Sequence, residues 1–291
     1  MATLLDGRSL ARTLREQLQA KAEAWSNRSG HIPTLALLRA GADEALLSHA
    51  RSVRRTFERA GFGFQEIEMP AESTTEALVE EVRRLNGEPG VHGILIQEPL
   101  PAHVDHNAVV EALNPLKDVD GVHPLNAGRL LQQRGRYHVS STPLGGITLL
   151  ERYGITFQGA LAVVVGRSNI VGKPLALLLL HRHATVVLCH SRTKGLAELT
   201  RQADILCVAV GRAGLITGEM VKPGATVVDF GINVVDGHLV GDVAFDSVAE
   251  RAGALTPVPG GTGPVTAAML LRNTLQAAQW LAEQNNTGTA T

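Results

Sequence analysis

The fold is decided by residues 160–174, which read ALAVVVGRSNIVGKP. An apolar, β-branched run ends at Gly166, a polar turn follows it, and an apolar helical pattern resumes at residues 175–180. This pattern is typical of a buried parallel strand that enters a helix through a tight loop. Because the backbone N–H groups of such a loop and the positive end of the helix attract negative charge, the loop is a candidate anion site.

The spacing of the loop fits neither standard phosphate-binding motif. The dinucleotide fingerprint is G-x-G-x-x-G, and a P-loop has four residues between its glycines and Ser or Thr after its lysine. Here five residues separate Gly166 from Gly172, and Pro174 follows Lys173. The loop alone therefore leaves two interpretations open, a nucleotide site and a glycine turn without a ligand.

The next predicted strand, residues 185–189, favours the nucleotide site. It ends in the sequence HSRT, where a second Rossmann strand would end. An NAD site usually has Asp or Glu there to bind the ribose hydroxyls, whereas arginine accommodates a 2′-phosphate. Ser191 and Arg192, with Arg167 in the first loop, therefore indicate NADP, and a solvated polar turn is the alternative.

Length, charge and cysteine usage limit the class of protein. At 291 residues the chain is long enough for two domains, and its net charge of −1 gives no indication of a nucleic-acid or membrane partner. Cys189 and Cys207 both fall inside predicted strands, which is typical of core residues in a reduced, cytoplasmic protein and not of a disulfide or metal pair. The longest apolar runs have the length of strands, so we expect no transmembrane helix, and the N-terminus lacks the apolar core of a signal peptide.

Strands alternate with helices along the whole chain. Besides the two strands above, apolar runs predict strands at residues 34–38, 63–68, 91–97, 204–210 and 225–230. Helices are expected between them, with a final helix at residues 265–284. This alternation predicts an α/β fold with a mainly parallel sheet, whose ligand sites lie at the carboxyl ends of the strands.

Short signals mark several element boundaries. Asp6 is a candidate helix cap, and Ser73 with Glu76 has capping-box spacing ahead of a helix. The dipeptide DG at residues 236–237 predicts a tight hairpin turn. Residues 256–264, TPVPGGTGP, contain too much proline and glycine for regular structure, so they predict a shaped loop.

Four segments, in their order along the chain, resemble the methylenetetrahydrofolate dehydrogenase/cyclohydrolase family. They are GILIQEPLP at residues 93–101, KDVDG at 117–121, the loop at 166–174 and TPVPGGTGP at 256–264. The resemblance extends over nearly the whole chain. It implies NADP-dependent oxidation of 5,10-methylenetetrahydrofolate to the methenyl form in one-carbon metabolism, followed by hydrolysis to 10-formyltetrahydrofolate.

The resemblance also implies two α/β domains with a cleft between them. A folate-binding catalytic domain would comprise residues 1–140, completed by the C-terminal helix at 265–284, and a Rossmann-like NADP domain would comprise residues 141–264. A homodimer formed through the Rossmann half is implied as well, and we expect the edge near residues 225–243 to form it.

Site residues follow from the resemblance position by position. Gln97 would lie beside the reacting carbon of the folate, and Asp120 would bond the pterin ring; the alternative is that both only cap loops. The folate site would be lined by Pro99 and Leu100 and closed by Pro259, Gly260 and Gly261. NADP would be bound by Thr142, Gly166, Arg167, Ser168, Ser191, Arg192 and Ile232, with Thr142 near the nicotinamide. No metal is implied.

One helix departs from the family's pattern. The family has a tyrosine, a catalytic lysine four residues later and another lysine two residues after that; these positions here are His49, Val53 and Arg55. Residues four apart share a helix face, so we expect His49 and Val53 both to face the folate. Val53 has no proton to transfer, whereas His49, a residue type with an ordinary pKa of about 6.5, is a candidate substitute base.

The two reactions depend on the lysine to different degrees. Hydride transfer chiefly requires the nicotinamide and the folate carbon to be positioned, whereas hydrolysis needs acid–base catalysis, typically worth roughly 10²–10⁴-fold. We therefore predict an NADP-dependent methylenetetrahydrofolate dehydrogenase with weak or absent cyclohydrolase activity. Two alternatives stay open, an NADP-dependent dehydrogenase of another substrate and a catalytically silent NADP- or folate-binding protein.

Overall fold

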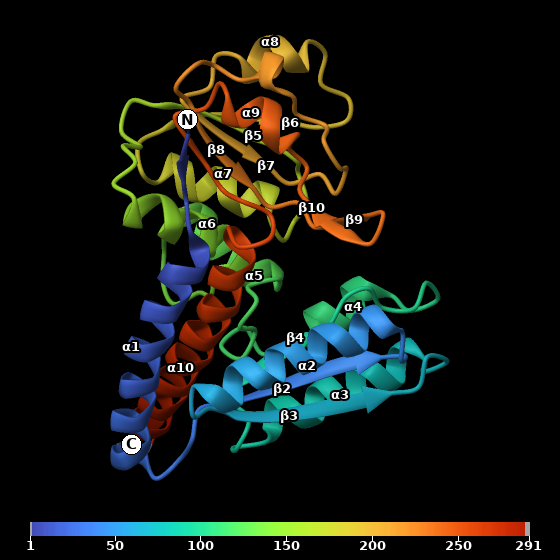
Figure 1. Cartoon of the computed structure of the whole chain (residues 1–291). Coiled ribbons are helices and arrows are strands. Elements are labelled where there is room, and N and C mark those ends of the chain that lie inside the picture. Colours follow the sequence, from blue (N-terminus) through green and yellow to red (C-terminus); the bar gives the residue numbers. More distant parts are fainter. Residues whose placement is uncertain (1, 289–291) are drawn as a thin grey trace. The chain divides into compact units, whose positions relative to one another are not determined.

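The computed structural model describes residues 2–288, apart from the side chains of Ala45 and residues 285–288. The chain forms two compact units (Figure 1). Thr13–Ser141 and the residues from Leu270 onward form one, which we call the three-strand unit. The residues up to Arg12 and Thr142–Met269 form the other, the six-strand unit. The three divisions fall inside the helices α1 (Gly7–Ser29), α6 (Ser141–Arg152) and α10 (Thr262–Gly288).

The three-strand unit is built on a parallel sheet with the strand order β3-β2-β4. Its strands are β2 (Thr34–Ala40), β3 (Gly63–Met69) and β4 (Gly93–Ile96). Because successive side chains of a strand point to opposite faces, β2 contributes to two cores. Leu35 and Leu37 pack with α2 (Glu44–Arg59), and Ala36 and Leu38 pack with α3 (Thr75–Gly87). Helices therefore cover both faces of this sheet (Figure 1).

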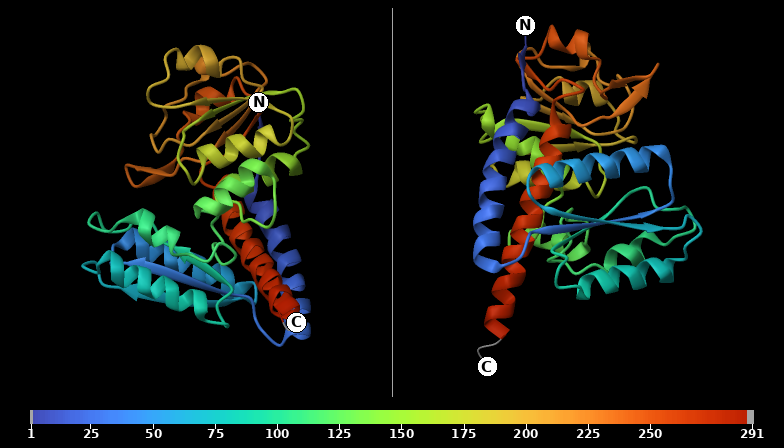
Figure 2. Two further views of the ribbon diagram at one scale, coloured as in Figure 1. Left: turned by 180° about the vertical axis from the view of Figure 1, so that it is seen from behind. Right: turned by 60° about the horizontal axis from the view of Figure 1, so that its bottom comes forward.

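Two short helices and parts of the two long ones complete this unit. The short helices are α4 (His106–Glu111) and α5 (Pro124–Gln132). Leu18 and Trp25 of α1 share one core cluster with Leu271 of α10, and the two helices lie side by side in both views of Figure 2.

The six-strand unit has the strand order β1-β11-β8-β7-β5-β6, and all neighbouring strands are parallel. Its strands are β1 (Thr3–Leu4), β5 (Leu161–Val165), β6 (Thr185–Cys189), β7 (Ile205–Val208), β8 (Thr226–Asp229) and β11 (Ala254–Leu255). The chain leaves β5 for β6 on one side and then returns to β7 on the other side of β5. Open α/β sheets bind their ligands at such a switch point, outside the carboxyl ends of the strands.

Short helices and one hairpin surround this larger sheet. The helices are α6 (Ser141–Arg152), α7 (Gly172–Leu180), α8 (Leu196–Thr200), the 3₁₀-helix η1 (Gly218–Met220) and α9 (Phe245–Ala249). The hairpin consists of β9 (Asn233–Val235) and β10 (His238–Val240). Asp236 and Gly237 at its tip have φ of 49° and 76°, which confirms the predicted tight turn.

The predicted α/β fold with parallel sheets is confirmed, and two local details differ. Asp6 Oδ1 accepts hydrogen bonds from the backbone at the start of α1, as expected for a cap. The cap of α3 is Thr74 and not Ser73, because Thr74 Oγ1 accepts a hydrogen bond of 3.2 Å from Ala77 N. The last helix begins at Thr262, earlier than the predicted residue 265, and continues to Gly288. Residues 2–288 include no helix that is both long and apolar enough to span a membrane.

Candidate active site

The glycine loop after β5 forms a tight turn into α7. Gly166 has a φ of 126°, and a Cβ there would lie 2.1 Å from the carbonyl oxygen of Ala209. A Cβ on Gly172 would lie 2.0 Å from the carbonyl oxygen of Gly166. Ser168 Oγ accepts hydrogen bonds of 3.1 and 3.3 Å from Val171 N and Gly172 N. Both glycines are therefore required, because protein backbone approaches them closely inside the turn.

The end of β6 lies beside this loop. Gly166 N donates a hydrogen bond of 2.9 Å to the carbonyl oxygen of Cys189, the last residue of β6. Ser191 and Arg192 follow it and are exposed, as is Arg167 in the glycine loop. The structure therefore brings the predicted cofactor residues of the two segments to one edge of the sheet, at the carboxyl ends of β5 and β6.

The proline–glycine loop forms a cavity of about 230 Å³ in the same unit. This cavity is lined by Arg8, Gly231, Ile232, Leu239 and residues 257–264. The predicted cofactor residue Ile232 thus lies together with the predicted folate residues Pro259, Gly260 and Gly261. Arg8 had not been predicted, since no motif marks it; it is placed there because Gly7 N donates a hydrogen bond of 2.9 Å to the carbonyl oxygen of Gly260.

Thr142 is partly exposed in the first turn of α6. A Cβ on Gly146 of the same helix would lie 2.3 Å from the ring of Phe230. α6 therefore packs directly on the residue that follows β8, one residue before Gly231. This packing places the helix of Thr142 on the segment that leads to Ile232.

In the three-strand unit, Gln97 follows β4 and is 3% exposed. Its Nε2 donates a hydrogen bond of 2.7 Å to the carbonyl oxygen of Leu46 in α2. Its Oε1 is buried and lacks a well-formed hydrogen bond to any described residue. Partial burial lowers the pKa of His49, which interaction with the Gln97 side chain opposes. Since this pKa lies below 6.5, the imidazole of His49 is largely neutral at pH 7.

Val53 and His49 differ in exposure although they lie one turn apart on α2. His49 is exposed, whereas Val53 is 7% exposed and packs in an apolar cluster with Leu37, Phe57 and Leu95. A short apolar side chain at this position is stabilised by burial against the sheet. Position 53, where the resemblance implies a lysine, is therefore part of the hydrophobic core in this chain.

Pro99 and Leu100 lie in the turn that follows Gln97. The peptide bond between Glu98 and Pro99 is cis, and Leu100 N donates a hydrogen bond of 3.1 Å to Glu98 Oε2. Glu98 Oε1 also lies 2.6 Å from His106 Nε2 at the start of α4. No motif had indicated this pair of side chains, which joins the turn to α4.

Asp120, also in the three-strand unit, has a carboxyl group whose surroundings change its pKa. Its Oδ1 accepts a hydrogen bond of 3.2 Å from Ser141 N. Burial raises the pKa of Asp120 to about 7; the hydrogen bond from Ser141 opposes this effect and the nearby Asp118 adds to it. Asp120 is therefore poised between its neutral and ionised forms near neutral pH.

The turn that carries Asp120 is held from two sides. The carboxylate of Asp118 is fully buried and accepts hydrogen bonds from two backbone N–H groups and from Asn126 Nδ2. Asn273 of α10 donates hydrogen bonds of 2.7 and 2.9 Å to the carbonyl oxygens of Val119 and Val139. These contacts fix the backbone on both sides of the Asp120–Ser141 hydrogen bond.

Lys117 in the same turn has an ammonium group that is bound to backbone. Its Nζ donates hydrogen bonds of 3.1 and 2.8 Å to the carbonyl oxygens of Leu85 and Glu88 at the end of α3. Burial lowers the pKa of Lys117 to about 8, which would suit acid–base catalysis. Its ammonium group is nevertheless committed to the carbonyl groups of the helix end.

Cysteine and metal chemistry are not evident in the described part of the chain. Within residues 2–288, no group of three or more His, Cys, Asp or Glu side chains could hold a metal ion. Cys189 and Cys207 are free and buried, as predicted, and burial raises the pKa of Cys207 to about 12.

Comparison with known protein families covers nearly the whole chain. Residues 5–120 match the catalytic domain described as tetrahydrofolate dehydrogenase/cyclohydrolase, and residues 140–282 match the NAD(P)-binding domain of the same description. The chain belongs to the tetrahydrofolate dehydrogenase/cyclohydrolase family. The resemblance inferred from four sequence segments is therefore confirmed.

Individual relatives in this family are similar over the same length. The bifunctional protein FolD of Herpetosiphon aurantiacus is 54% identical over 284 residues, which cover 97% of this chain and 99% of that protein. The crystal structure of the bifunctional enzyme FolD from Campylobacter jejuni has a TM-score of 0.94 and 40% identity, and covers 97% of this chain and 100% of that one. The FolD structure from Trypanosoma brucei, complexed with NADP cofactor and inhibitor, has a TM-score of 0.92 and 38% identity, and covers 97% and 98%.

Membership of the tetrahydrofolate dehydrogenase/cyclohydrolase family bears on the two interpretations of the glycine loop. The loop from Gly166 to Gly172 lies inside the matched NAD(P)-binding domain. It is therefore part of an NAD(P)-binding domain, which favours the nucleotide interpretation of the loop.

Proposed function

We propose that this family member is an NADP-dependent methylenetetrahydrofolate dehydrogenase whose cyclohydrolase activity is weak or absent. The observation that carries the proposal is the combination of Gln97 and Asp120 with a buried valine at position 53. The relatives named above are bifunctional, so the proposal is that this chain keeps the first reaction and has lost most of the second.

Asp120 and Gln97 supply the polar groups for folate binding in the three-strand unit. The carboxylate of Asp120 keeps acceptor capacity beyond its hydrogen bond from Ser141 N, and it would accept N–H groups of the pterin. Gln97 is fixed by its hydrogen bond to the carbonyl oxygen of Leu46, and its side chain would lie beside the reacting carbon of the folate. Pro99 and Leu100 add apolar contact beside them.

The residues of the six-strand unit fit NADP. Gly166 and Gly172 allow the tight turn between β5 and α7, and the backbone N–H groups of this turn at the start of α7 would bind the pyrophosphate. Arg167, Ser191 and Arg192 are exposed where a 2′-phosphate would lie. When bound, NADP supplies the hydride acceptor; Thr142, Ile232 and the proline–glycine loop would hold and orient the reacting rings.

Hydrolysis of the methenyl product needs a proton donor or acceptor that this chain lacks at position 53. Val53 has no ionisable group, and the ammonium of Lys117 bonds to two carbonyl oxygens elsewhere. Loss of acid–base catalysis typically costs roughly 10²–10⁴-fold. The methenyl compound would therefore be released largely unhydrolysed.

A second candidate retains both reactions, with His49 as the base. His49 is exposed, interacts with the Gln97 side chain and is largely neutral at pH 7, so it could accept a proton from water. The exposure of His49 beside Gln97 is the observation that favours this candidate.

The organisation of the protein is part of the same proposal. We assign folate binding to residues 1–140 with the C-terminal helix, and NADP binding to residues 141–264. The hairpin β9–β10 would form a homodimer interface, because Val234 of β9 is 70% exposed and Leu239 of β10 is 47% exposed. A cytoplasmic location agrees with two unpaired cysteines in the core.

The deciding experiment uses two absorbance assays on the purified protein. The first follows NADPH formation from NADP and methylenetetrahydrofolate, and the second follows decay of added methenyltetrahydrofolate. We expect rapid NADPH formation and decay close to the buffer rate. Absence of NADPH formation, with NADP binding intact, would favour a different substrate or a silent binding protein.

A further inference from the structure

Asp242 is a fully buried carboxylate between β10 and α9 of the six-strand unit. Its Oδ2 accepts hydrogen bonds of 2.7 and 3.0 Å from Val210 N and Gly211 N. Its Oδ1 accepts bonds of 2.7 Å from Arg212 N and 2.9 Å from Asn233 Nδ2. One side chain thus binds three consecutive backbone N–H groups of a loop and one side chain of the neighbouring hairpin.

The loop that Asp242 binds is in contact with the glycine turn. It follows β7, next to β5 in the sheet, and Ala209 N donates a hydrogen bond of 2.8 Å to Val165 O. The carbonyl oxygen of Ala209 occupies the space where a Cβ of Gly166 would lie. Displacement of residues 209–212 would therefore change the wall of the turn to which we assign the pyrophosphate.

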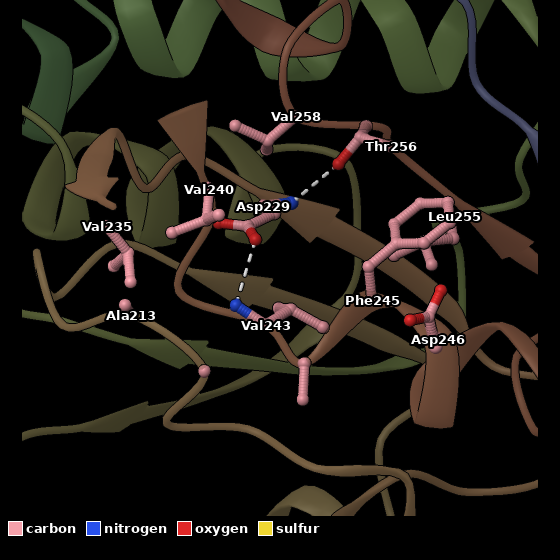
Figure 3. Close-up of a pocket in the computed structure, with 13 residues that line it drawn as sticks. Ala213, Asp229, Val235, Val240, Val243, Phe245, Asp246, Leu255, Thr256 and Val258 are labelled. Atoms are coloured by element: carbon pink, nitrogen blue, oxygen red, sulfur yellow. Dashed lines mark hydrogen bonds between the residues drawn. The ribbon is translucent and has the colours of Figure 1, made fainter. Parts of the chain in front are cut away.

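A second buried carboxylate, Asp229 at the end of β8, completes the arrangement. Its Oδ1 accepts hydrogen bonds of 2.8 and 3.0 Å from Gly231 N and Asp242 N. Its Oδ2 accepts a hydrogen bond of 2.9 Å from Val243 N. Asp229 and Val243 both line a cavity of about 390 Å³ (Figure 3). Asp229 binds Gly231, the residue before Ile232, and Asp242 binds Asn233, the residue after it.

The backbone is shaped to surround the two carboxylates. A Cβ on Gly231 would lie 2.4 Å from Asp242, and a Cβ on Gly241 would lie 1.9 Å from Asp229 Oδ2. Neither carboxylate forms an ion pair with a described residue, so both rely on neutral donors. Burial of a carboxylate that has only neutral partners destabilises the folded state. Apolar side chains at these positions would give a more stable core if packing alone were required.

We propose that Asp242, supported by Asp229, is a positioning residue for the cofactor site. Asp242 holds residues 209–212 against Gly166 and, through Asn233, holds the segment that carries Ile232. It fixes two separate walls of the NADP site without touching the cofactor. The inference rests on the proposed function, because it assigns NADP to these walls.

The test is Asp242→Asn, which keeps the shape of the side chain but turns an N–H group toward backbone N–H groups. A hydrogen bond to a charged group is stronger than one between neutral groups. Loss of one such bond should therefore raise the Kd and the KM for NADP about tenfold or more. The KM for methylenetetrahydrofolate should change less than the KM for NADP, because Gln97 and Asp120 lie in the other unit. NADP affinity is measured by calorimetry, which needs no turnover.

A matched control is Asp204→Asn in the same unit. Asp204 accepts hydrogen bonds from Leu161 N and Lys222 Nζ, but it lies at the amino ends of β5 and β7, away from their carboxyl ends. It should lose thermal stability without a change in NADP affinity. If Asp242→Asn also lowers thermal stability and leaves the affinity for NADP unchanged, the role of Asp242 is structural and the proposal is overturned.

A milder variant covers the case in which Asp242→Asn does not fold. Asn233→Ala removes one partner of Asp242 from a partly exposed position, and we expect a rise of about threefold in the Kd for NADP. An unchanged Kd in Asn233→Ala would also overturn the proposal. If the unaltered protein binds NADP but does not oxidise the folate, the proposed reaction is wrong while the comparison of Kd values still tests Asp242.

Discussion

Gln97 Nε2 donates a hydrogen bond of 2.7 Å to the carbonyl oxygen of Leu46, which joins the residue after β4 to the first turn of α2. This bond uses the amide of Gln97, so its buried Oε1 is the group left for a ligand or for His49. The same helix carries Val53 in the core one turn after His49. The chemistry of the folate site therefore depends on how α2 packs on its sheet and on which side chains it carries at positions 49 and 53.

Val53→Lys should restore part of the cyclohydrolase activity. The new ammonium group would be partly buried, which lowers its pKa toward neutrality and makes it a usable acid or base. We expect faster decay of added methenyltetrahydrofolate, by up to roughly 10²-fold, and a lower melting temperature because a core valine is lost. The double variant with His49→Tyr should hydrolyse faster than either single variant.

His49→Ala is the control for this prediction. If hydrolysis is slow because Val53 replaces the lysine, His49→Ala should leave the slow rate unchanged. Rapid hydrolysis by the unaltered protein, abolished in His49→Ala, would show that His49 is the base and that the lysine argument is wrong.

Arg192→Ala should reduce the preference for NADP over NAD. Arg192 is exposed at the end of β6, where it can bind a 2′-phosphate by charge-assisted hydrogen bonds. Loss of such a bond should raise the KM for NADP about tenfold or more and leave the KM for NAD nearly unchanged. Equal losses with both cofactors in steady-state assays would mean that Arg192 does not bind this phosphate.

Asp120→Asn should change the pH dependence of stability and of folate binding. The pKa of Asp120 is raised from an ordinary 3.8 to about 7, so between these values the folded state holds a proton that the unfolded state has released. The free energy of unfolding therefore falls as pH rises through this window. Asp120→Asn removes this contribution, so its melting temperature relative to the unaltered protein should increase from pH 5 to pH 7.5.

Folate binding provides a second readout for Asp120. Because the carboxylate is the form that accepts two N–H groups of the pterin, the folate KM should rise as pH falls below about 7. This pH dependence should be absent in Asp120→Asn, whose KM should be high throughout. A parallel pH profile for the two proteins would show that Asp120 is not the titrating group.

Val234→Asp should convert the proposed homodimer into a monomer. Val234 is 70% exposed on β9, so a carboxylate there costs little in the isolated chain but would be desolvated in an apolar interface. Light scattering should give twice the 30.9 kDa chain mass for the unaltered protein and the single mass for the variant. A single-chain mass for the unaltered protein at micromolar concentration would exclude the dimer.

The order of the elements and the family could be predicted from short stretches of the sequence. Apolar β-branched runs that end at glycine, such as residues 160–166, are local signals, because strand and turn preferences act on neighbouring residues. The segments around Gln97, Asp120 and Gly166 are contiguous, so their match to the family needs no knowledge of the fold. The replacement of the lysine by Val53 is likewise visible in one helix.

Only the tertiary structure decided what these side chains touch. Asn273 bonds to Val119 across 154 residues, and Asp242 binds a loop about thirty residues earlier; neither pairing has a periodicity that a sequence can display. Val53 is buried although His49, one turn earlier on α2, is exposed. This difference depends on how α2 packs on its sheet, which the i, i+4 spacing does not specify. Hydrogen bonds and burial between distant segments arise from the packing of whole elements, and for that reason the supports of the site are decided by the fold.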